Sequence, residues 1–282
     1  MQNINSHTPD SDKVNESIWT SQSWQNLTSS FGLLKVLDVA CELKLFTLIA
    51  EKPSTASALA EETGCKPYYL KALLDTCVSM CLLKTEDVLY YCRQPALTYL
   101  DETSDYYVGH FLHIISVESV MWNGLMNLIQ HGEVPENNAE VETEVFTMGM
   151  HALGMLGEAD NLLAHVDIGD AIQLVDVGCG SGVYSIAFCE QYPNLRATLL
   201  DRPEVLETTK RVVSQSSISD RIEFKIADMV KDDYGNDRDV VLLSDVLYQS
   251  RKDCITILSS AFRALKPGGL LIIVDILYCT FE

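Results

Sequence analysis

From residue 170 onward, the chain alternates short runs of β-branched and other apolar residues with longer segments of helical spacing. Runs that are apolar along their whole length are typical of parallel strands buried on both faces, and such strands need a crossover helix between them. The alternation therefore predicts an α/β domain, with a Rossmann-like parallel sheet covered by helices on both sides. The expected strands are residues 172–177, 197–200, 222–226, 240–243 and 270–274.

The first half of the chain has a different pattern, in which apolar residues recur at helical spacing between short polar breaks. Ser54 or Thr55 is suited to cap a helix, Gly64 to end it and Pro67 to begin the next one. A small hairpin after the third helix completes a winged-helix pattern. The expected elements are a polar tail over residues 1–27, helices over 31–50, from 54 or 55 to 62 and over 67–80, and hairpin strands over 82–84 and 88–92.

A winged helix suggests DNA binding, but the charge of this chain argues against it. The chain has 20 basic and 40 acidic residues, a formal net charge of −20. Its third helix offers only Lys71, offset by Asp75, whereas binding to nucleic acid or to an anionic membrane surface needs clustered Lys and Arg. We therefore predict no nucleic-acid or membrane partner, and we interpret the winged helix as a packing and dimerisation module.

Between the two patterns lies a mostly helical connector, which we expect to contribute to a substrate pocket. Its acidic stretch at residues 131–144 predicts an exposed loop. Its bulky residues are expected to pack in a core: Phe111, Trp122, Met126, Phe146, Met148, Met150 and Met155. The predicted division is a tail over 1–27, a winged-helix dimerisation domain over 28–104, the connector over 105–169 and the Rossmann-like domain over 170–282.

The cellular compartment can be predicted from the spacing of the cysteines and from the lack of long apolar segments. The nine cysteines are scattered, odd in number and never spaced as C-x-x-C, so neither a disulfide framework nor a metal site is expected. The polar N-terminus lacks the apolar run of a signal peptide, and the apolar stretch at 270–274 is too short to cross a bilayer. These features predict a cytoplasmic protein.

A glycine-rich loop follows the first strand of the α/β domain, in the sequence Leu-Val-Asp-Val-Gly-Cys-Gly-Ser-Gly that ends at Gly182. Glycines let a chain turn sharply and present bare backbone N–H groups to a ligand at the start of a helix. The dinucleotide motif G-x-G-x-x-G needs its third glycine or alanine at position 183, which is Val183. The spacing therefore argues against NAD. We place Asp176, Gly178, Gly180 and Gly182 in a cofactor site.

Acidic residues end the next two strands. Asp201 ends the second strand, where a carboxylate can accept hydrogen bonds from both ribose hydroxyls of a nucleoside. Asp228 and Met229 end the third, where the carboxylate suits the exocyclic amine of adenine and the thioether suits the face of its ring. Ligands of open α/β sheets bind outside the carboxyl ends of the strands, so these residues are predicted to share one site.

These segments, VDVGCGSG, LLDRPEVL, ADM and LKPGGLLIIVD, resemble the motifs of class I S-adenosylmethionine-dependent methyltransferases. With the winged helix, they resemble the two-domain small-molecule O-methyltransferases of the caffeic-acid and acetylserotonin type, and also the bacteriochlorophyllide C-20 methyltransferase. The resemblance implies that the glycine loop faces the methionine moiety of S-adenosylmethionine, that Asp201 faces the ribose, and that Asp228 and Met229 face the adenine. It also implies a homodimer formed through the N-terminal domain and a small, aromatic or macrocyclic acceptor.

One departure from the family concerns the catalytic base. The O-methyltransferases carry a His in a Leu-His-Asp-Trp pattern after the fourth strand, but this chain has Leu247-Tyr248-Gln249-Ser250 there and no histidine after His165. A tyrosine with an ordinary pKa near 10 is a poor base at neutral pH. The bacteriochlorophyllide-type enzymes also have Leu-Tyr at this position, so carbon methylation is an alternative to oxygen methylation. Tyr248, His151 and Asp245 are the candidate bases.

A second departure is that the chain stops seven residues beyond Asp275, whereas the family's sheet continues with two more strands. We therefore expect a sheet without those strands, with its fifth strand at an open edge, and impaired activity. A truncated product, a covering partner and an incomplete acceptor pocket all remain open explanations. The alternative function is a catalytically silent homologue that acts as a cofactor-binding dimeric module.

Overall fold

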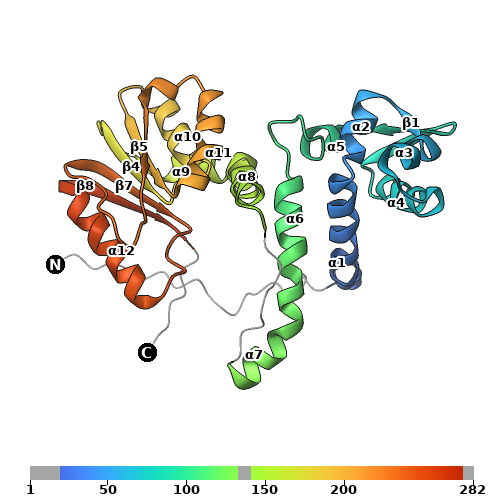
Figure 1. Cartoon of the computed structure of the whole chain (residues 1–282), viewed down its shortest axis with the longest axis horizontal. Helices are drawn as coiled ribbons and strands as arrows, with labels where there is room; N and C mark the ends of the chain where they lie inside the picture. Colours follow the sequence, from blue (N-terminus) through green and yellow to red (C-terminus); the bar gives the residue numbers. More distant parts are fainter. Residues whose placement is uncertain (1–19, 133–140, 276–282) are drawn as a thin grey trace.

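The computed structural model describes residues 20–132 and 141–275. A helical domain built from the N-terminal part of the chain lies apart from an α/β domain, and long helices run between the two (Figure 1). Both predicted fold classes are confirmed, since the N-terminal domain is helical with a small hairpin and the second domain has a parallel sheet with helices.

The α/β domain contains a five-stranded, wholly parallel sheet with the strand order β6-β5-β4-β7-β8. All five expected strands are present, and each lies within a few residues of its predicted bounds. Because the strands are parallel, all their carboxyl ends lie at one edge of the sheet. The strands are β4 (Gln173–Val177), β5 (Arg196–Asp201), β6 (Ile222–Ile226), β7 (Arg238–Ser244) and β8 (Leu265–Val274).

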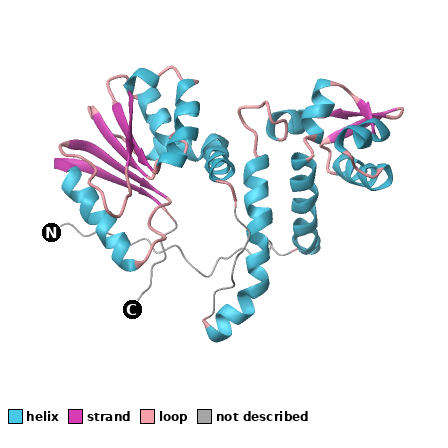
Figure 2. Cartoon of the chain, viewed as in Figure 1, coloured by secondary structure: helices cyan, strands magenta, loops and turns pink. Residues whose placement is uncertain are grey.

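Alternate side chains along each strand enter two different cores. Leu174 of β4 packs in one core with Phe188, whereas its neighbour Val175 packs in the other core with Ile257. Helices therefore cover both faces of the sheet, as the apolar strands predicted (Figure 2). The covering helices are α9 (Ala159–His165), α10 (Val183–Gln191) and α11 (Pro203–Ser214) on one face and α12 (Arg251–Ala264) on the other, with a short 3₁₀ turn at Ser219–Arg221.

The N-terminal domain has the helices and hairpin of the winged-helix pattern. Thr55 caps the second short helix by accepting a hydrogen bond from Ala58 N at 3.2 Å, and Gly64 ends it with a φ of 69°. A two-residue strand adds a third member to the hairpin. The elements are α1 (Ser21–Glu42), α2 (Leu45–Glu51), β1 (Ser54–Thr55), α3 (Ala56–Thr63), α4 (Pro67–Ser79), β2 (Leu83–Glu86), β3 (Leu89–Cys92) and α5 (Gln94–Tyr99).

Two predictions for this domain were wrong. The tail was expected to extend to residue 27, but α1 begins at Ser21, where the side chain of Thr20 caps it. A single helix was expected over 31–50, but α1 ends at Glu42 and α2 begins at Leu45. Between them, Lys44 has a left-handed φ of 53°, which an α-helix does not accommodate.

The connector is helical over its described parts, and its helix α6 packs against both α1 and α8 (Figure 1). The expected acidic loop at 131–144 falls largely outside the described residues.

The core-packing prediction was wrong for Trp122, Met126 and Phe146, whose side chains are exposed. The elements are α6 (Gly109–Glu118), a 3₁₀ segment (Ser119–Gly124), α7 (Leu125–His131), α8 (Thr143–Leu153) and a π-helical turn, η4 (Gly154–Glu158).

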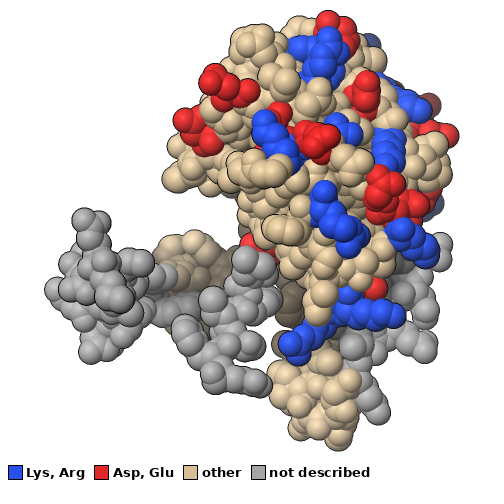
Figure 3. All heavy atoms as spheres, turned by 90° about the vertical axis from the view of Figure 1, so that its left-hand side faces the viewer, with Lys and Arg blue, Asp and Glu red and all other residues tan. Residues whose placement is uncertain are grey.

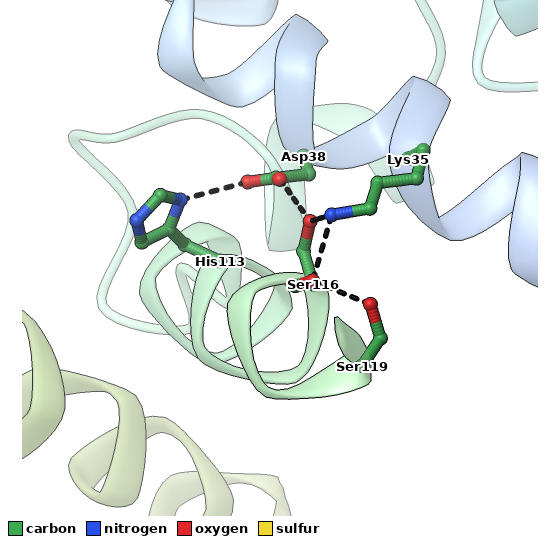
Figure 4. Close-up of polar contacts among 5 residues, drawn as sticks. All are labelled: Lys35, Asp38, His113, Ser116 and Ser119. Carbon is green, nitrogen blue, oxygen red and sulfur yellow. Dashed lines mark hydrogen bonds and ion pairs between the residues drawn. The ribbon is translucent and has the colours of Figure 1, made fainter. Parts of the chain in front are cut away.

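A polar network joins α1 to α6 (Figure 4). The buried carboxylate of Asp38 accepts a hydrogen bond from the Ser116 hydroxyl and lies 3.0 Å from Nδ1 of His113. Lys35 donates to the backbone oxygen of Ser116 at 2.7 Å and also contacts its hydroxyl. The hydroxyl of Ser119 donates to the same backbone oxygen at 2.6 Å. These contacts hold α1 of the N-terminal domain against α6 of the connector.

Basic side chains on two parts of the described surface lie close to acidic ones. On α4, the ammonium of Lys71 pairs with Asp75 at 2.6 Å and so is not free for phosphate. On the face of the α/β domain that holds β8 and α12, basic and acidic side chains are interspersed (Figure 3). No helix in the described part of the chain is both long and apolar enough to span a membrane.

Candidate active site

A cavity of about 610 Å³ lies at the carboxyl ends of β4, β5, β6 and β7. The strands and the turns after them form its floor, while α8 and the π-helical turn η4 contribute a second wall. Its size is within the range of small-molecule and cofactor pockets. This is the edge of the sheet at which the sequence predicted a ligand.

The glycine loop forms part of the cavity, and all three of its glycines have positive φ. At Gly180, with a φ of 53°, a Cβ atom would find open space, so its backbone faces the cavity rather than packed protein. At Gly182, with a φ of 81°, a Cβ atom would come within 2.8 Å of Leu199 Cδ1. The loop therefore needs glycine at Gly182 for packing, and at Gly180 it presents bare backbone to a ligand.

Asp201 is held beside this loop by two backbone amides. Its Oδ2 accepts a hydrogen bond from Gly180 N at 3.0 Å and its Oδ1 accepts one from Arg202 N at 2.8 Å. Burial raises the pKa of the carboxyl, although the two amides oppose that shift. A carboxylate has about four acceptor positions, so two remain for further donors such as a pair of hydroxyls. Thr209, which the sequence analysis missed, braces the loop by donating to Gly180 O at 2.7 Å.

Asp228 and Met229 line the cavity on the β6 side. Asp228 Oδ1 accepts from Val230 N at 2.9 Å, and Oδ2 forms an ion pair with Lys231 at 2.5 Å. That ion pair is the main reason why the pKa of Asp228 is lowered. The structure thus brings Asp228, Met229, Asp201, Gly178 and Gly180 to one cavity, whereas Gly182 does not line it.

Asp176 is the most deeply buried acid of the cavity, with 2% of its surface exposed. Ser185 donates to its Oδ2 at 2.7 Å, and no partner for its Oδ1 is recorded among residues 20–132 and 141–275. Burial raises the pKa of this carboxyl to about 7. Arg238 Nε is the only fully buried side-chain N or O atom without a partner among the described residues, so the second oxygen of Asp176 reaches the cavity and can accept from a ligand there.

The two predicted catalytic residues differ in their positions. Tyr248 follows β7, lines the cavity and is 73% exposed at its mouth. His151 of α8 is half-buried outside the cavity lining, with Nδ1 3.0 Å from Ser181 Oγ, and burial lowers its pKa. The structure therefore brings Tyr248 to the cavity and leaves His151 behind its wall.

Three further polar residues line the cavity, and the sequence analysis singled out only one of them. Tyr184 donates to Glu158 Oε2 at 3.0 Å, and neither residue belongs to a motif that marks it in the sequence. Asp245, a candidate base in the sequence, has a left-handed φ of 49°, and its backbone N donates to Val274 O at 2.8 Å. Burial raises the pKa of Asp245, and the nearby carboxylates of Asp275 and Glu158 raise it further.

Comparison with protein families identifies the chain. A model described as an O-methyltransferase domain matches residues 132–280, which is more than half of the chain. The chain belongs to the O-methyltransferase family. A second model, described as an O-methyltransferase dimerisation domain, matches residues 25–102 of this family member.

Individual proteins agree with the family match. The chain is 28% identical over 281 residues to acetylserotonin O-methyltransferase of Bos taurus, covering 89% of this chain and 79% of that protein. It is 27% identical over 257 residues to bacteriochlorophyllide d C-20 methyltransferase of Chlorobaculum tepidum, covering 85% and 73%. The crystal structure of human N-acetylserotonin methyltransferase in complex with S-adenosylmethionine matches with a TM-score of 0.77 and 25% identity, over 89% of this chain and 78% of that one.

The family is S-adenosylmethionine-dependent and acts on small molecules, and the residues of this chain fit the cofactor. Gly180 leaves room for a ligand, and Asp201 and Asp176 both have acceptor positions that no other described residue uses. The expected impairment by a short carboxyl end is not supported by the family match. Among the described residues, no group of three or more His, Cys, Asp or Glu is arranged to hold a metal ion.

Proposed function

We propose that this O-methyltransferase family member transfers a methyl group from S-adenosylmethionine to a small aromatic or macrocyclic acceptor, at oxygen or carbon. The observation that carries the proposal is that one cavity is lined by the glycine loop and by the carboxylates of Asp201 and Asp228, at the ends of successive strands. The cofactor supplies an activated methyl group on a sulfonium, so the protein's main task is alignment.

The chain's own residues can perform that alignment. The backbone at Gly180 and the free acceptor positions of Asp201 hold the adenosyl amino acid, and Met229 packs on the β6 side. The opposite wall carries Phe146, Met150 and Leu153, an apolar surface suited to a flat acceptor that excludes water. Holding two reactants in line can contribute up to about 7–11 kcal/mol to the rate.

A proton must leave the acceptor when a hydroxyl is methylated. Tyr248 is the group at the mouth of the cavity, and it can hydrogen-bond to the acceptor or relay a proton to solvent. The relatives include both an oxygen and a carbon methyltransferase by name, so both acceptor atoms stay within the proposal. His151 lies behind the cavity wall, and its contact with Ser181 supports a role in shaping the glycine loop.

The test is transfer of labelled methyl from S-adenosylmethionine to a metabolite extract. We expect labelled small molecules with the wild-type chain and none with Asp201→Ala, because the variant loses the carboxylate that holds Gly180. Tyr248→Phe should lower kcat at least tenfold and leave S-adenosylhomocysteine affinity unchanged, whereas His151→Asn should leave kcat within about threefold. Absence of labelled product with folded wild-type protein would overturn the proposed catalysis.

A second candidate is a catalytically silent dimeric module that binds the cofactor. The observation that favours it is the lack of any histidine among the described residues lining the cavity. This reading predicts tight S-adenosylhomocysteine binding without transfer to any acceptor. Detection of transfer that depends on Asp201 would exclude it.

We also propose that the chain forms a homodimer through its N-terminal domain. The dimerisation-domain match over residues 25–102 supports this, and so do exposed apolar side chains on α1, among them Leu27 and Phe31. Exposed apolar surface of this kind is typical of protein–protein contacts.

A further inference from the structure

The helix α8 contacts both the cavity and the glycine loop. It lies between α6 and the α/β domain (Figure 1). Several of its side chains line the cavity, and we call this surface the acceptor wall, whereas His151 of the same helix reaches the loop behind the wall. A shift of α8 would therefore move the wall and a contact of the loop together. The acceptor wall consists of Thr143, Phe146, Thr147, Met150 and Leu153.

The glycine loop is anchored from two directions. On the side of β5 and α11, the backbone of Gly180 donates to Asp201 and accepts from Thr209. On the side of α8, the hydroxyl of Ser181 lies 3.0 Å from Nδ1 of His151. In the described part of the chain, this is the one recorded side-chain hydrogen bond between the loop and the connector. Because Ser181 is 3% exposed and lines the cavity, the bond is shielded from water and adjoins the space for a ligand.

The backbone alone does not fix α8 on the α/β domain. Between α8 and α9 the chain passes through η4, where Gly157 has a φ of 116° and a Cβ atom would meet nothing within 4 Å. A glycine in this conformation, with open space around it, allows the chain to bend. Contacts made by α8 itself must therefore set its position. They include the buried pair His151–Ser181 and an exposed ion pair of Glu144 with Arg211 at 2.6 Å.

The remaining surface of α8 is packed tightly enough to transmit a movement. A Cβ atom at Gly149 would come within 3.3 Å of the Phe111 backbone on α6. One at Gly154, at the end of α8, would come within 2.5 Å of Val183 Cγ1 on α10. Close-packed interiors have little free volume and pass on small displacements. A change at the loop therefore reaches the acceptor wall through α8.

We propose that His151 is a positioning residue, which acts through Ser181 to hold the glycine loop against α8, so that cofactor in the loop orders the acceptor wall. The inference rests on the proposed function, because it assigns a role within the same site. Burial lowers the pKa of His151, so its ring is neutral near pH 7 and Nδ1 can donate to the hydroxyl or accept from it. A loop that is held in place before binding costs less to order when the ligand arrives.

Calorimetry with S-adenosylhomocysteine on the full chain tests the contact. His151→Leu keeps most of the side-chain volume but removes both nitrogens, and we expect the Kd to rise at least about fivefold, a typical factor for one lost hydrogen bond. His151→Asn places an oxygen or a nitrogen near the position of Nδ1, so its Kd should stay within about twofold of the wild type. A role in packing alone predicts the reverse order, because leucine fills the space of the ring better than asparagine does.

Two further variants show whether His151 acts through the loop. In a Ser181→Ala background, adding His151→Leu should change the Kd by less than about twofold, since both substitutions remove the same contact. The matched control Arg211→Ala breaks the exposed ion pair between α11 and α8 and should bind as the wild type does. Additive losses in the double variant, or weaker binding by His151→Asn than by His151→Leu, would overturn the inference.

Hydrogen exchange followed by mass spectrometry shows whether the effect reaches the acceptor wall. Saturating S-adenosylhomocysteine should slow amide exchange in residues 143–153 of the wild type and of His151→Asn, and this slowing should be lost in Ser181→Ala. No slowing in the wild type, or equal slowing in Ser181→Ala, would overturn the inference. If His151→Leu does not fold, the exchange results for Ser181→Ala and His151→Asn decide. If folded wild-type protein binds no S-adenosylhomocysteine at all, it is the proposed function that fails.

Discussion

Asp176 gives the described site a measurable pH dependence. In the folded chain burial raises its pKa from 3.8 to about 7, so the folded state holds a proton that the unfolded state has released. The free energy of unfolding therefore falls as the pH rises from about 4 through 7. The stabilisation by the bound proton is complete below the unfolded pKa of 3.8 and is lost as the pH passes the folded pKa. We expect Asp176→Asn to remove the part of this decrease in the free energy of unfolding that comes from Asp176.

The measurement is the thermal melting temperature between pH 4.5 and 8 without ligand. The difference between the Asp176→Asn variant and the wild type should grow in the variant's favour as the pH rises. The control Asp228→Asn should not show this growth, since the exposed Asp228 has a lowered pKa. Parallel curves for wild type and Asp176→Asn would contradict the account of Asp176.

The site residues that could be predicted from the sequence are those that directly follow a strand. Gly180, Asp201 and Asp228 each follow a strand directly, and parallel strands carry their ends to one edge, so their convergence could be predicted. Glu158 and Tyr184 could not, since they meet only because the π-helical turn η4 packs against α10. No local pattern encodes that approach.

The polar network around Asp38, which joins α1 to α6, predicts that its loss lowers the free energy of unfolding. Asp38→Ala would leave His113 and the hydroxyl of Ser116 without the carboxylate that lies between α1 and α6. Leaving a buried hydrogen-bond donor without its partner costs about 1–3 kcal/mol. Urea unfolding followed by circular dichroism should show that loss.

The matched control is Lys71→Ala, which breaks the exposed pair with Asp75 on α4. Exposed pairs contribute about 1 kcal/mol or less, so this variant should unfold close to the wild type. Equal stability of Asp38→Ala and Lys71→Ala would show that the network does not hold α1 against α6.

Element boundaries were predictable where a single residue type decides them. Thr55, Gly64 and Pro67 set the start or end of a helix through their own side chain or backbone. The break at Lys44 was not predictable, because lysine rarely adopts a left-handed φ and tertiary packing of α1 and α2 imposes it. The spacing of apolar residues continues across such a break and therefore does not reveal it.

For the whole molecule, the homodimer proposal gives a prediction that compares two exposed phenylalanines. Phe31 on α1 is 59% exposed in the dimerisation domain, and Phe262 on α12 is 78% exposed on the α/β domain. Phe31→Glu should shift the protein to a monomer in light scattering, because it places a charge in the apolar contact. Phe262→Glu should remain a dimer. If Phe31→Glu stays a dimer and Phe262→Glu becomes a monomer, the interface lies on the α/β domain and the proposal is wrong.

The overall architecture and the acidity of the molecule were both apparent from the sequence, but the distribution of charge was not. The net charge of −20 predicts that the chain binds no polyanionic partner. It did not predict which acids find a lysine or arginine partner, since that depends on the fold, as the ion pair of Asp228 with Lys231 shows.

The central claim is that the tips of β4, β5 and β6 form one site for an adenosyl amino acid. Titration of S-adenosylhomocysteine in a calorimeter tests it most directly. We predict one molecule bound per chain, and an affinity at least tenfold weaker for Asp201→Asn, because the amide offers half the acceptor capacity of the carboxylate. Wild-type protein that melts cooperatively yet releases no heat of binding at any concentration tested would contradict the claim.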